Sequence, residues 1–396
     1  MKTENERWIL PDGIDEVLPE EATIIERSRR ELLDLYAGWG YEFVIPPFVE
    51  FLDSLLIGTG RDLDLKTFKL TDQLSGRMMG VRADITPQAA RIDAHHLRCD
   101  VPTRLCYLGT VLHTRSDGFA GSRSPLQIGA ELYGHSGVES DIEILRLMMK
   151  TLERTGVQDL YLDLGHVGVF KGLARDAGLD LLQEAALFDA LQRKATPEIK
   201  QLLAECAIRP EHGERLLHLA ELNGEDALER ASRVLAGASG EVLGALDYLH
   251  KMQQQLAVWL PEVPVHFDLA ELRGYHFHTG VVFAAFVPGS GKEIARGGRY
   301  DDIGRVFGRA RPATGFSADL KTLIRIASQE SRGVPPARRV FAPWSEDRDQ
   351  QLLVERLRGE GCRVICGLPG QQGGAAELGC MEELVCRNGV WQLISV

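Results

Sequence analysis

The sequence predicts an α+β fold, in which an antiparallel sheet flanked by helices carries a helical insertion and is followed by a small α/β module. Strand patterns cluster in the first third of the chain and return only after residues 179–260, a stretch rich in Leu, Ala, Glu and Gln. Clustered strands are typical of α+β folds and not of alternating βαβ units. Two prolines, Pro335 and Pro336, then precede a tail at 338–396. We therefore divide the chain into a core, residues 1–330, which contains the insertion, and a C-terminal module.

Hydrophobic periodicity, caps and turn residues place the elements in order along the chain. Apolar residues at helical spacing after Pro19 predict a helix over 20–38. A proline in the first turn marks a helix over 87–97, and Ser140 is the expected N-cap of a helix over 140–154. The C-terminal module has the pattern strand, helix, strand and short strand pair. A last core helix is expected at 320–328. The remaining core elements are strands, and those at 67–70 and 78–82 form a hairpin. The strands are expected at 41–45, 67–70, 78–82, 104–112, 126–133, 265–269 and 277–286.

Composition restricts the class of protein. The net charge is −12 and the pI is near 5.5, which disfavours a polyanion such as tRNA because nucleic-acid binding depends on Lys and Arg. Residues 1–10 are polar, and no apolar run approaches the roughly 20 residues that a membrane helix needs, so we expect a cytoplasmic protein without a signal peptide or membrane span. The seven cysteines are scattered without a C-x-x-C pair, which favours free thiols over a disulfide framework or a zinc site.

The first candidate ligand segment is Arg82-Ala-Asp-Ile-Thr86. If residues 78–86 are extended, Arg82, Asp84 and Thr86 point to the same face. A carboxylate beside a hydroxyl is suited to an ammonium group, but the same pattern is typical of a solvated strand face. The segment alone does not decide between these two interpretations.

A second candidate lies within the strand predicted at 126–133. Gln127 and Glu131 share one face of that strand, opposite an apolar face. Gly129 lies between them and removes side-chain bulk where a ligand would sit. The pattern is compatible with a pocket and with an ordinary polar strand face, and both interpretations stay open.

Two further segments are rich in glycine and polar groups. In residues 271–280, Arg273 is followed by His276 and His278, but two histidines without a third ligand at a recognisable spacing do not indicate a metal site. In residues 295–302, two adjacent glycines allow the backbone to approach a ligand closely. That run lacks the pattern of a phosphate-binding loop. We expect neither a metal nor a cofactor.

Taken in order, these segments resemble the catalytic core of a class II aminoacyl-tRNA synthetase, specifically histidyl-tRNA synthetase, over about residues 10–326. Residues 10–19 and 40–47 are similar to the family's entry and to its first motif, which forms a dimer. The run LRGYHFHTG at 272–280 resembles the histidine-specific stretch R-G-L-D-Y-Y-T-G, and GGRYD at 297–301 is unchanged. The resemblance implies a class II synthetase-like core that self-associates as a dimer.

The resemblance also assigns a pocket for free histidine. The family holds the amino group with a Glu and a Thr, and completes the pocket with a Gln, a second Glu, an Arg and a Tyr. These positions fall, in chain order, on Asp84, Thr86, Gln127, Glu131, Arg273 and Tyr300. Asp84 replaces a Glu, and Phe277 and His278 replace two tyrosines. These departures put in doubt the affinity and the selectivity of the pocket for histidine.

The ATP chemistry of the family does not carry over. His113 stands where the second motif has its phosphate-binding Arg, and Arg115 stands where that motif has a Glu. Lys321 and Thr322 replace the E-R pair of the third motif. Adenylate formation depends on positioned cations, and Lys does not replace Arg in bidentate phosphate recognition. The tail at 338–396 is also too short for the family's anticodon-binding domain.

The family branch that fits these losses is that of the ATP phosphoribosyltransferase regulatory subunits. The resemblance implies a non-catalytic subunit that pairs with a short catalytic subunit in a hetero-octamer. Such a complex performs the first step of histidine biosynthesis, joining ATP to phosphoribosyl pyrophosphate, under feedback control by histidine. Two alternatives stay open: a divergent, active histidyl-tRNA synthetase, which predicts histidine-dependent exchange of pyrophosphate into ATP, and a free-standing histidine-binding or modifying protein, which predicts a homodimer that ignores the catalytic subunit.

Overall fold

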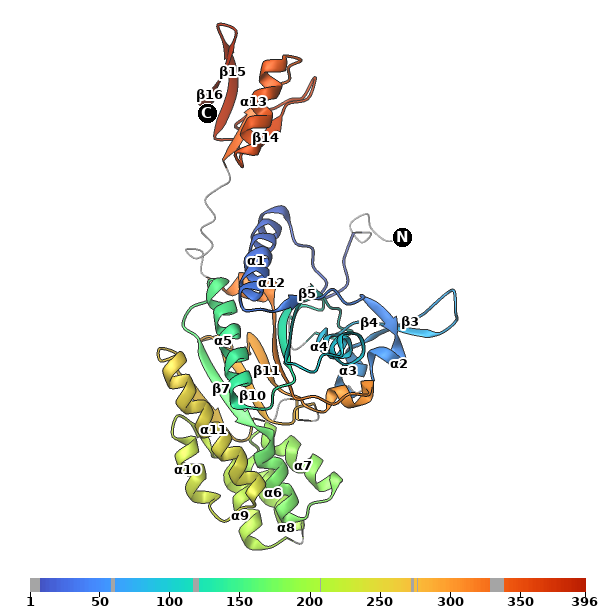
Figure 1. Cartoon of the computed structure of the whole chain (residues 1–396), viewed down its shortest axis with the longest axis vertical. Helices are drawn as coiled ribbons and strands as arrows, with labels where there is room; N and C mark the ends of the chain where they lie inside the picture. Colours follow the sequence, from blue (N-terminus) through green and yellow to red (C-terminus); the bar gives the residue numbers. More distant parts are fainter. Residues whose placement is uncertain are drawn as a thin grey trace. The chain divides into compact units, whose positions relative to one another are not determined.

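The computed structural model of the chain describes residues 8–57, 61–116, 121–206, 208–271, 274–275, 277–327 and 338–396. The chain divides into two compact units, residues 1–331 and 332–396 (Figure 1). Within the described residues, no helix combines the length and the apolar character needed to cross a membrane.

A large, mostly antiparallel sheet organises the first unit. Only its β1–β5 and β7–β9 pairs are parallel, so the predicted α+β class with an antiparallel sheet is confirmed. Among the described residues it has nine strands, in the order β1 (Glu42–Phe43), β5 (Thr103–Thr110), β6 (Leu126–Tyr133), β12 (Ala313–Asp319), β11 (Ala295–Arg299), β10 (Val281–Phe286), β7 (Tyr161–His166), β9 (Val265–Asp268) and β8 (Asn223–Gly224).

Two long helices, α1 (Pro19–Gly38) and α5 (Val138–Arg154), cover one face of this sheet. Their apolar sides, with Leu32 and Met148 fully buried, pack on the strand residues that point to this face, such as Ile128. The predicted helix over 20–38 is confirmed. The prediction of Ser140 as an N-cap is wrong, because α5 begins two residues earlier after an extended Gly137, and the Ser140 hydroxyl donates to the Gly137 carbonyl (2.7 Å).

The opposite face of the sheet is bordered by a small subdomain. Its three described strands are β2 (Val49–Phe51), β4 (Met78–Val81) and β3 (Phe68–Thr71), and β3 and β4 form the predicted hairpin. The strand predicted at 78–82 is confirmed as β4, but the extended conformation that we considered for residues 78–86 does not continue beyond it. β4 ends at Val81, and α4 (Thr86–Arg91) begins at Thr86, because Pro87 in the first turn favours a helix. The short helices nearby are α2 (Leu52–Leu55), α3 (Arg61–Lys66) and a π-helix that continues α4 (Ile92–Leu97).

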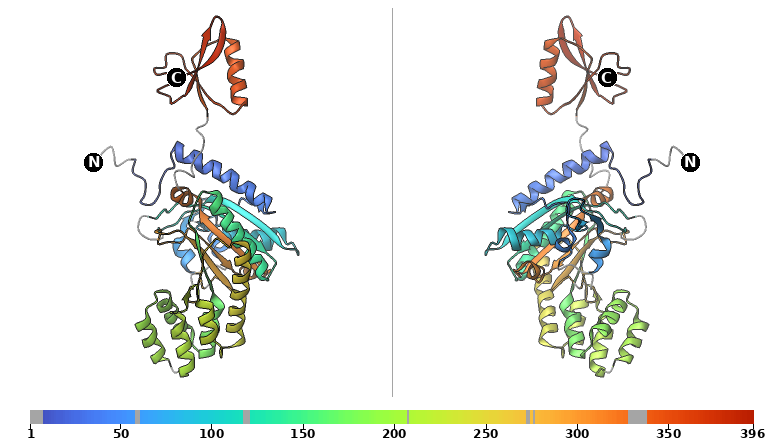
Figure 2. Two further views of the ribbon diagram at one scale, coloured as in Figure 1. Left: turned by 90° about the vertical axis from the view of Figure 1, so that its left-hand side faces the viewer. Right: turned by 90° about the vertical axis from the view of Figure 1, so that its right-hand side faces the viewer.

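The predicted helical insertion corresponds to five helices from α7 to α11 in the described chain. The sequence reading missed β7 and the helix that follows it, α6, which packs against α9 and α11 and so belongs to the same lobe. Figures 1 and 2 show these helices gathered at one end of the large sheet. The helices are α6 (Val167–Ala177), α7 (Leu181–Gln192), α8 (Thr196–Glu205), α9 (Pro210–Leu219), α10 (Ala227–Val234) and α11 (Gly240–Trp259).

The last part of the core returns to the sheet. The chain passes from β11 through a 3-10 helix (Ile303–Phe307) to β12 and then into α12 (Leu320–Ile326). The sequence reading placed a helix near α12 but did not recognise β11 or β12 as strands. β11 contains two adjacent glycines and β12 contains one, and these glycines hide the alternation of a strand.

The second unit is a four-stranded sheet with one helix. Val354 and Leu357 of the helix pack over Val340 and Leu384 of the sheet, which forms a separate small core. The predicted pattern of strand, helix, strand and strand pair is confirmed. Its elements, with strands in sheet order, are β14 (Arg363–Cys366), β13 (Arg339–Ala342), β15 (Glu382–Arg387), β16 (Val390–Ser395) and the helix α13 (Arg348–Gly359).

Candidate functional site

Glu131 lies at the centre of the candidate site, in the middle of β6 on the sheet face opposite α1 and α5. Its side chain is almost completely buried. The hydroxyl of Tyr107 donates to Oε1 of Glu131 (2.9 Å), and the hydroxyl of Tyr300 donates to Oε2. Gly315 faces Glu131 on β12, and a Cβ atom there would overlap the Glu131 carboxylate. Residue 315 must therefore be a glycine to leave room for the Glu131 carboxylate.

Tyr107, on β5, is a site residue that sequence reasoning missed. Its oxygen lies 3.0 Å from Oγ1 of Thr86, and because Tyr107 donates to Glu131 it accepts from Thr86. In the sheet register Tyr107 is paired with Gly129. A Cβ atom at Gly129 would lie 2.5 Å from the Tyr107 oxygen and from the Phe316 carbonyl oxygen. The prediction that Gly129 leaves space for a ligand is therefore wrong, since the Tyr107 ring fills that space.

Asp84 and Gln127 form the second part of the site. The Gln127 amide donates to Oδ1 of Asp84 (2.8 Å) and accepts from the backbone N–H of Ile85 (2.9 Å), so it ties the turn before α4 to β6. Oδ1 of Asp84 also accepts from the backbone N–H of Thr86 (2.9 Å). Oδ2 of this half-buried carboxylate makes no hydrogen bond with the described residues, which leaves it for a cationic group.

The electrostatics of the site favour a positively charged ligand. Burial raises the pKa of Glu131 to about 8, although hydrogen bonds from Tyr300 and Tyr107 act in the opposite direction. Burial also raises the pKa of both tyrosines well above their usual value, so they remain hydrogen-bond donors. Near neutral pH the ligand-free Glu131 is mainly protonated. A cation in the site would stabilise its ionised form.

Tyr300 also packs against a second aromatic ring. The ring of half-buried Phe277 stacks on Tyr300, with ring centroids 4.9 Å apart and an interplanar angle of 27°. Five of the six expected pocket residues thus meet in one place. The sixth, Arg273, lies outside the described residues, as does His276, and its role stays a prediction.

The glycine pair of β11 packs within the protein. A Cβ atom at Gly297 would lie 2.5 Å from the ring of Phe283, and one at Gly298 would lie 2.8 Å from Nδ1 of His278. The expectation that these glycines bring the backbone close to a ligand is therefore wrong. They allow neighbouring strands and the His278 ring to pack against β11.

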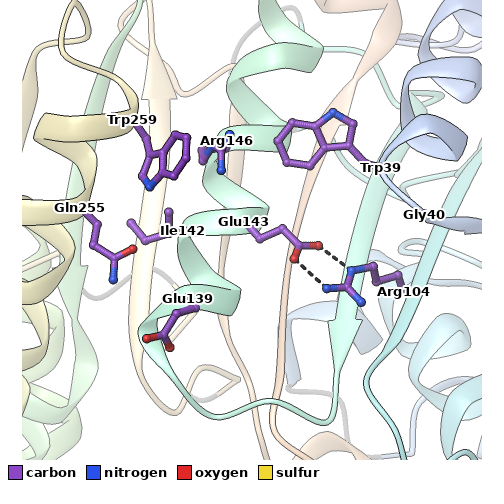
Figure 3. Close-up of a pocket in the computed structure, with 9 residues that line it drawn as sticks. All are labelled: Trp39, Gly40, Arg104, Glu139, Ile142, Glu143, Arg146, Gln255 and Trp259. Atoms are coloured by element: carbon purple, nitrogen blue, oxygen red, sulfur yellow. Dashed lines mark hydrogen bonds and ion pairs between the residues drawn. The ribbon is translucent and has the colours of Figure 1, made fainter.

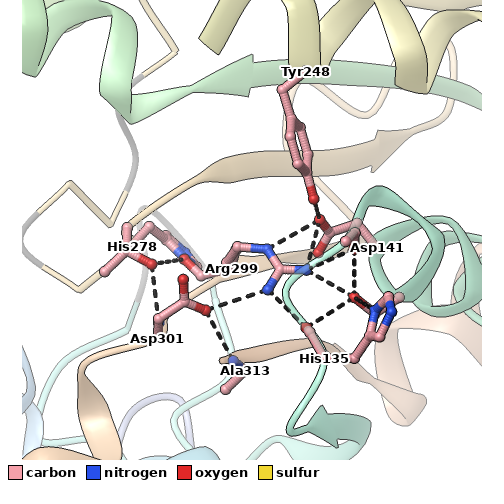
Figure 4. A network of polar contacts seen from close by, with 10 residues as sticks. His135, Asp141, Tyr248, His278, Arg299, Asp301 and Ala313 are labelled. Carbon is pink, nitrogen blue, oxygen red and sulfur yellow. Dashed lines mark hydrogen bonds and ion pairs between the residues drawn. The ribbon is translucent and has the colours of Figure 1, made fainter. Parts of the chain in front are cut away.

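Arg299, next to Tyr300, is a second residue that sequence reasoning missed. Its guanidinium donates to Oδ2 of buried Asp141 (2.9 and 3.1 Å) and to the Ser140 hydroxyl (2.8 Å), and the Tyr248 hydroxyl donates to the same Asp141 oxygen. Figure 4 shows that this network joins β11 to α5 and α11. The available signal was the arginine within the GGRYD run at 297–301.

The groups at the ATP-binding positions of the resemblance are engaged within the protein. Nε2 of His113 lies 2.8 Å from the Ala83 carbonyl oxygen. The buried Lys321 ammonium donates to the Ser124 carbonyl (2.9 Å), and Thr322 donates to Asp319 (2.6 Å). These side chains stabilise the fold, whereas Arg115 is exposed at the surface.

Comparisons with known proteins identify the fold and the family of the chain. Residues 13–323 match the family model for histidyl-tRNA synthetase, and residues 337–394 match that for the C-terminal domain of ATP phosphoribosyltransferase subunit HisZ. The fold is similar to that of a histidyl-tRNA synthetase from Nostoc (TM-score 0.78, 19% identity, 98% of this chain and 97% of that chain covered).

Two relatives are more specific. A crystal structure described as an ATP phosphoribosyltransferase regulatory subunit/histidyl-tRNA synthetase from Bacillus halodurans has a TM-score of 0.83 and 25% identity, covering 94% of this chain and 96% of that one. An ATP phosphoribosyltransferase regulatory subunit from Thioalkalivibrio sulfidiphilus is 61% identical over 391 residues, 98% of each chain. The chain therefore belongs to the family of ATP phosphoribosyltransferase regulatory subunits.

Proposed function

We propose that the chain binds free histidine in the pocket around Glu131 and regulates a catalytic ATP phosphoribosyltransferase chain without catalysing a reaction itself. The observation that carries this proposal is a buried carboxylate held by two tyrosine hydroxyls, beside an Asp84 carboxylate with one oxygen left for a ligand. Two carboxylates in one site fit a ligand with two nitrogen-bearing groups.

Histidine has complementary groups for each part of this pocket. Its ammonium group would donate to Oδ2 of Asp84, and an imidazole N–H would donate to Glu131. The stacked rings of Phe277 and Tyr300 offer a flat surface for the imidazole. The resemblance to histidyl-tRNA synthetase assigns the remaining charge, the ligand carboxylate, to Arg273.

A non-catalytic role is supported by the residues at the phosphate positions. Lys321 and Thr322 donate to internal acceptors, and His113 contacts a backbone carbonyl. Realigning Lys321 toward a nucleotide would leave the Ser124 carbonyl without this partner, and an unsatisfied buried group is unfavourable by about 1 to 3 kcal/mol. We expect the isolated chain to show no histidine-dependent exchange of pyrophosphate into ATP. Exchange above background would favour an active synthetase instead.

Assembly is part of the same proposal. β1 is a two-residue strand at the edge of the large sheet, and Phe43, Ile45 and Phe48 near it are 40, 80 and 44% exposed. Exposed apolar side chains at a sheet edge favour association with another chain. We assign this edge to a homodimer contact. The homodimer would combine with the short catalytic subunit in a cytoplasmic hetero-octamer. We propose no role for tRNA or for a membrane.

Isothermal titration calorimetry with histidine tests the pocket. Glu131→Ala and Arg273→Ala are expected to abolish measurable binding, because each removes a charged partner of the ligand. Glu131→Gln keeps the shape and should also weaken binding strongly. His113→Ala and Thr322→Ala are the controls and should leave binding and partner activation unchanged, with thermal melts confirming folding. Unchanged affinity in both Glu131→Ala and Arg273→Ala would contradict the pocket assignment.

A further inference from the structure

A groove of about 490 Å³ lies on the sheet face that carries α1 and α5, away from Glu131. Its walls are Trp39, after the end of α1, and Trp259, at the end of α11. One side of α5 lies between the two walls, and Figure 3 shows both indole rings beside Arg146 of that helix. Arg104 of β5, paired in the sheet register with Leu132 rather than with Glu131, completes the groove.

The two arginines of the groove differ in their partners. Arg104 binds Glu143 through two hydrogen bonds (2.7 and 2.8 Å), and Glu143 also accepts from the Tyr41 hydroxyl (2.9 Å). Arg146 instead lies between the two indoles, closer to that of Trp259. Its guanidinium carbon is 3.8 Å from the centre of the Trp259 ring and 5.4 Å from the centre of the Trp39 ring, and it makes no hydrogen bond or ion pair with the residues that the structure describes. Because Arg146 lines the groove, its N–H donors are available to an occupant.

This arrangement defines the chemistry of an occupant. A guanidinium with free in-plane donors binds a carboxylate through two parallel hydrogen bonds. The Trp39 and Trp259 rings and the buried Ile142 below them offer apolar surface on either side of that carboxylate. Tryptophan and arginine are also the residue types most enriched at the energetic centres of protein interfaces. The expected occupant is an acidic side chain or chain terminus next to an apolar group.

The exposed apolar surface continues beyond the groove, which indicates a macromolecule rather than a small metabolite. Val258 is 72% exposed and Trp259 is 51% exposed at the end of α11. A metabolite inside the groove would leave much of this surface in water, whereas a protein partner would cover it.

The groove shares its two helices with the network around Arg299. Asp141, on α5 between Glu139 and Glu143, accepts from Arg299 and from Tyr248 of α11. Arg299 precedes Tyr300, which donates to Glu131. Because Arg299 is the last residue of β11 and Tyr300 follows it, we expect a change in the Tyr300–Glu131 contact to reach α5 and α11 through Arg299. A partner that responds to histidine needs such a connection, whereas a second copy of the chain does not.

We propose that this groove is the docking surface for the catalytic ATP phosphoribosyltransferase chain, which brings a carboxylate to Arg146 beside the two tryptophans. The inference rests on the proposed function. It adds the surface and the chemistry of the contact.

Co-assembly with a purified short-form catalytic chain from the same source tests the proposal. Arg146→Glu and Trp259→Ala are expected to weaken co-assembly by about tenfold or more, since each removes a residue at the centre of the contact. Their matched controls are Arg233→Glu on α10 and Leu243→Ala, an exposed apolar residue on α11, and both should assemble like the wild type. For each variant without the catalytic chain, calorimetry with histidine should show an intact pocket, and light scattering should show an intact dimer.

The possible results separate the two proposals. If the wild-type chain does not bind the catalytic chain, the proposed function and the docking surface are both wrong. If the wild type binds and the two groove variants bind equally well, the docking surface alone is wrong. If Arg146→Glu or Trp259→Ala turns the isolated dimer into a monomer, the groove is a contact between copies of this chain, which also overturns the proposal.

Discussion

At the scale of single residues, Glu131 determines what the pocket recognises. Burial raises its pKa to about 8, so in the empty pocket near neutral pH it is mainly a neutral acid. A positive group a few ångströms away reverses that balance, because it stabilises the carboxylate. Histidine binding near pH 7 should therefore release a proton from Glu131, and we expect neutral ligands of similar size to bind more weakly.

The raised pKa also predicts how stability depends on pH. The folded chain holds the Glu131 proton up to a pKa of about 8, whereas the ordinary value is 4.5. The contribution of this group to stability is therefore complete below the ordinary pKa and is lost as the pH rises through the folded pKa. Between about pH 5 and pH 9 the wild type should lose free energy of unfolding relative to Glu131→Gln, by on the order of a few kcal/mol.

Urea denaturation of both chains at several pH values measures this difference. The Gln variant is the matched control because it keeps the size of the side chain and does not titrate. A difference in unfolding free energy that stays constant with pH would show that the folded Glu131 has an ordinary pKa.

The sequence identified Asp84, Thr86, Gln127, Glu131 and Tyr300 through their positions in a known family pattern, and the structure brings these five together. It did not identify Tyr107. The contact of Tyr107 with Glu131 depends on the register between β5 and β6, which pairs Leu105 with Glu131. That register is a long-range property that local patterns do not contain, and it also placed the Tyr107 ring where Gly129 was expected to leave space for a ligand.

At the scale of elements, β11 connects the pocket to the helices on the other face of the sheet. Arg299 and Asp141 are both buried, with side chains 6 and 0% exposed, and they are bound to each other by an ion pair of 2.9 Å. Removing one partner leaves the other charge buried without compensation. The pair therefore fixes α5 against β11, and through Tyr248 it fixes α11 as well.

Replacing Arg299 by Met tests the importance of this pair. We expect the free energy of unfolding to fall by about 3 to 5 kcal/mol, because Asp141 keeps a buried charge without its partner. The double variant Arg299→Met, Asp141→Asn should recover part of that loss. Chemical denaturation of the single and double variants measures both values, and a loss below about 1 kcal/mol for the single variant would place Arg299 outside the stabilising network.

Prediction of the elements succeeded where a local signal is strong. Helix α1 has apolar periodicity and a proline in its first turn, and the β3–β4 hairpin has a turn between two strand patterns. Prediction failed where the local sequence pattern indicates a loop but tertiary packing forms a strand. β11 contains two glycines that read as a loop, although it is a strand because Phe283 and His278 pack against those glycines.

At the scale of the whole molecule, composition and the order of elements predicted the α+β class, the helical insertion and the small last module. The strand order of the large sheet is not predictable in this way. β6 lies between β5 and β12, although β12 is separated from it by the entire helical lobe in the sequence. Such pairings depend on which faces are buried together, and only the folded chain contains that information.

The central claim is that a synthetase-like pocket for histidine now controls a partner's chemistry. Its most direct test is phosphoribosyl transfer by the short catalytic chain, measured with and without this chain while histidine is titrated. We expect activity to require both chains, to fall with added histidine for the wild type, and to become insensitive to histidine with Glu131→Gln. Equal inhibition by histidine of the wild-type and Glu131→Gln complexes would contradict the claim.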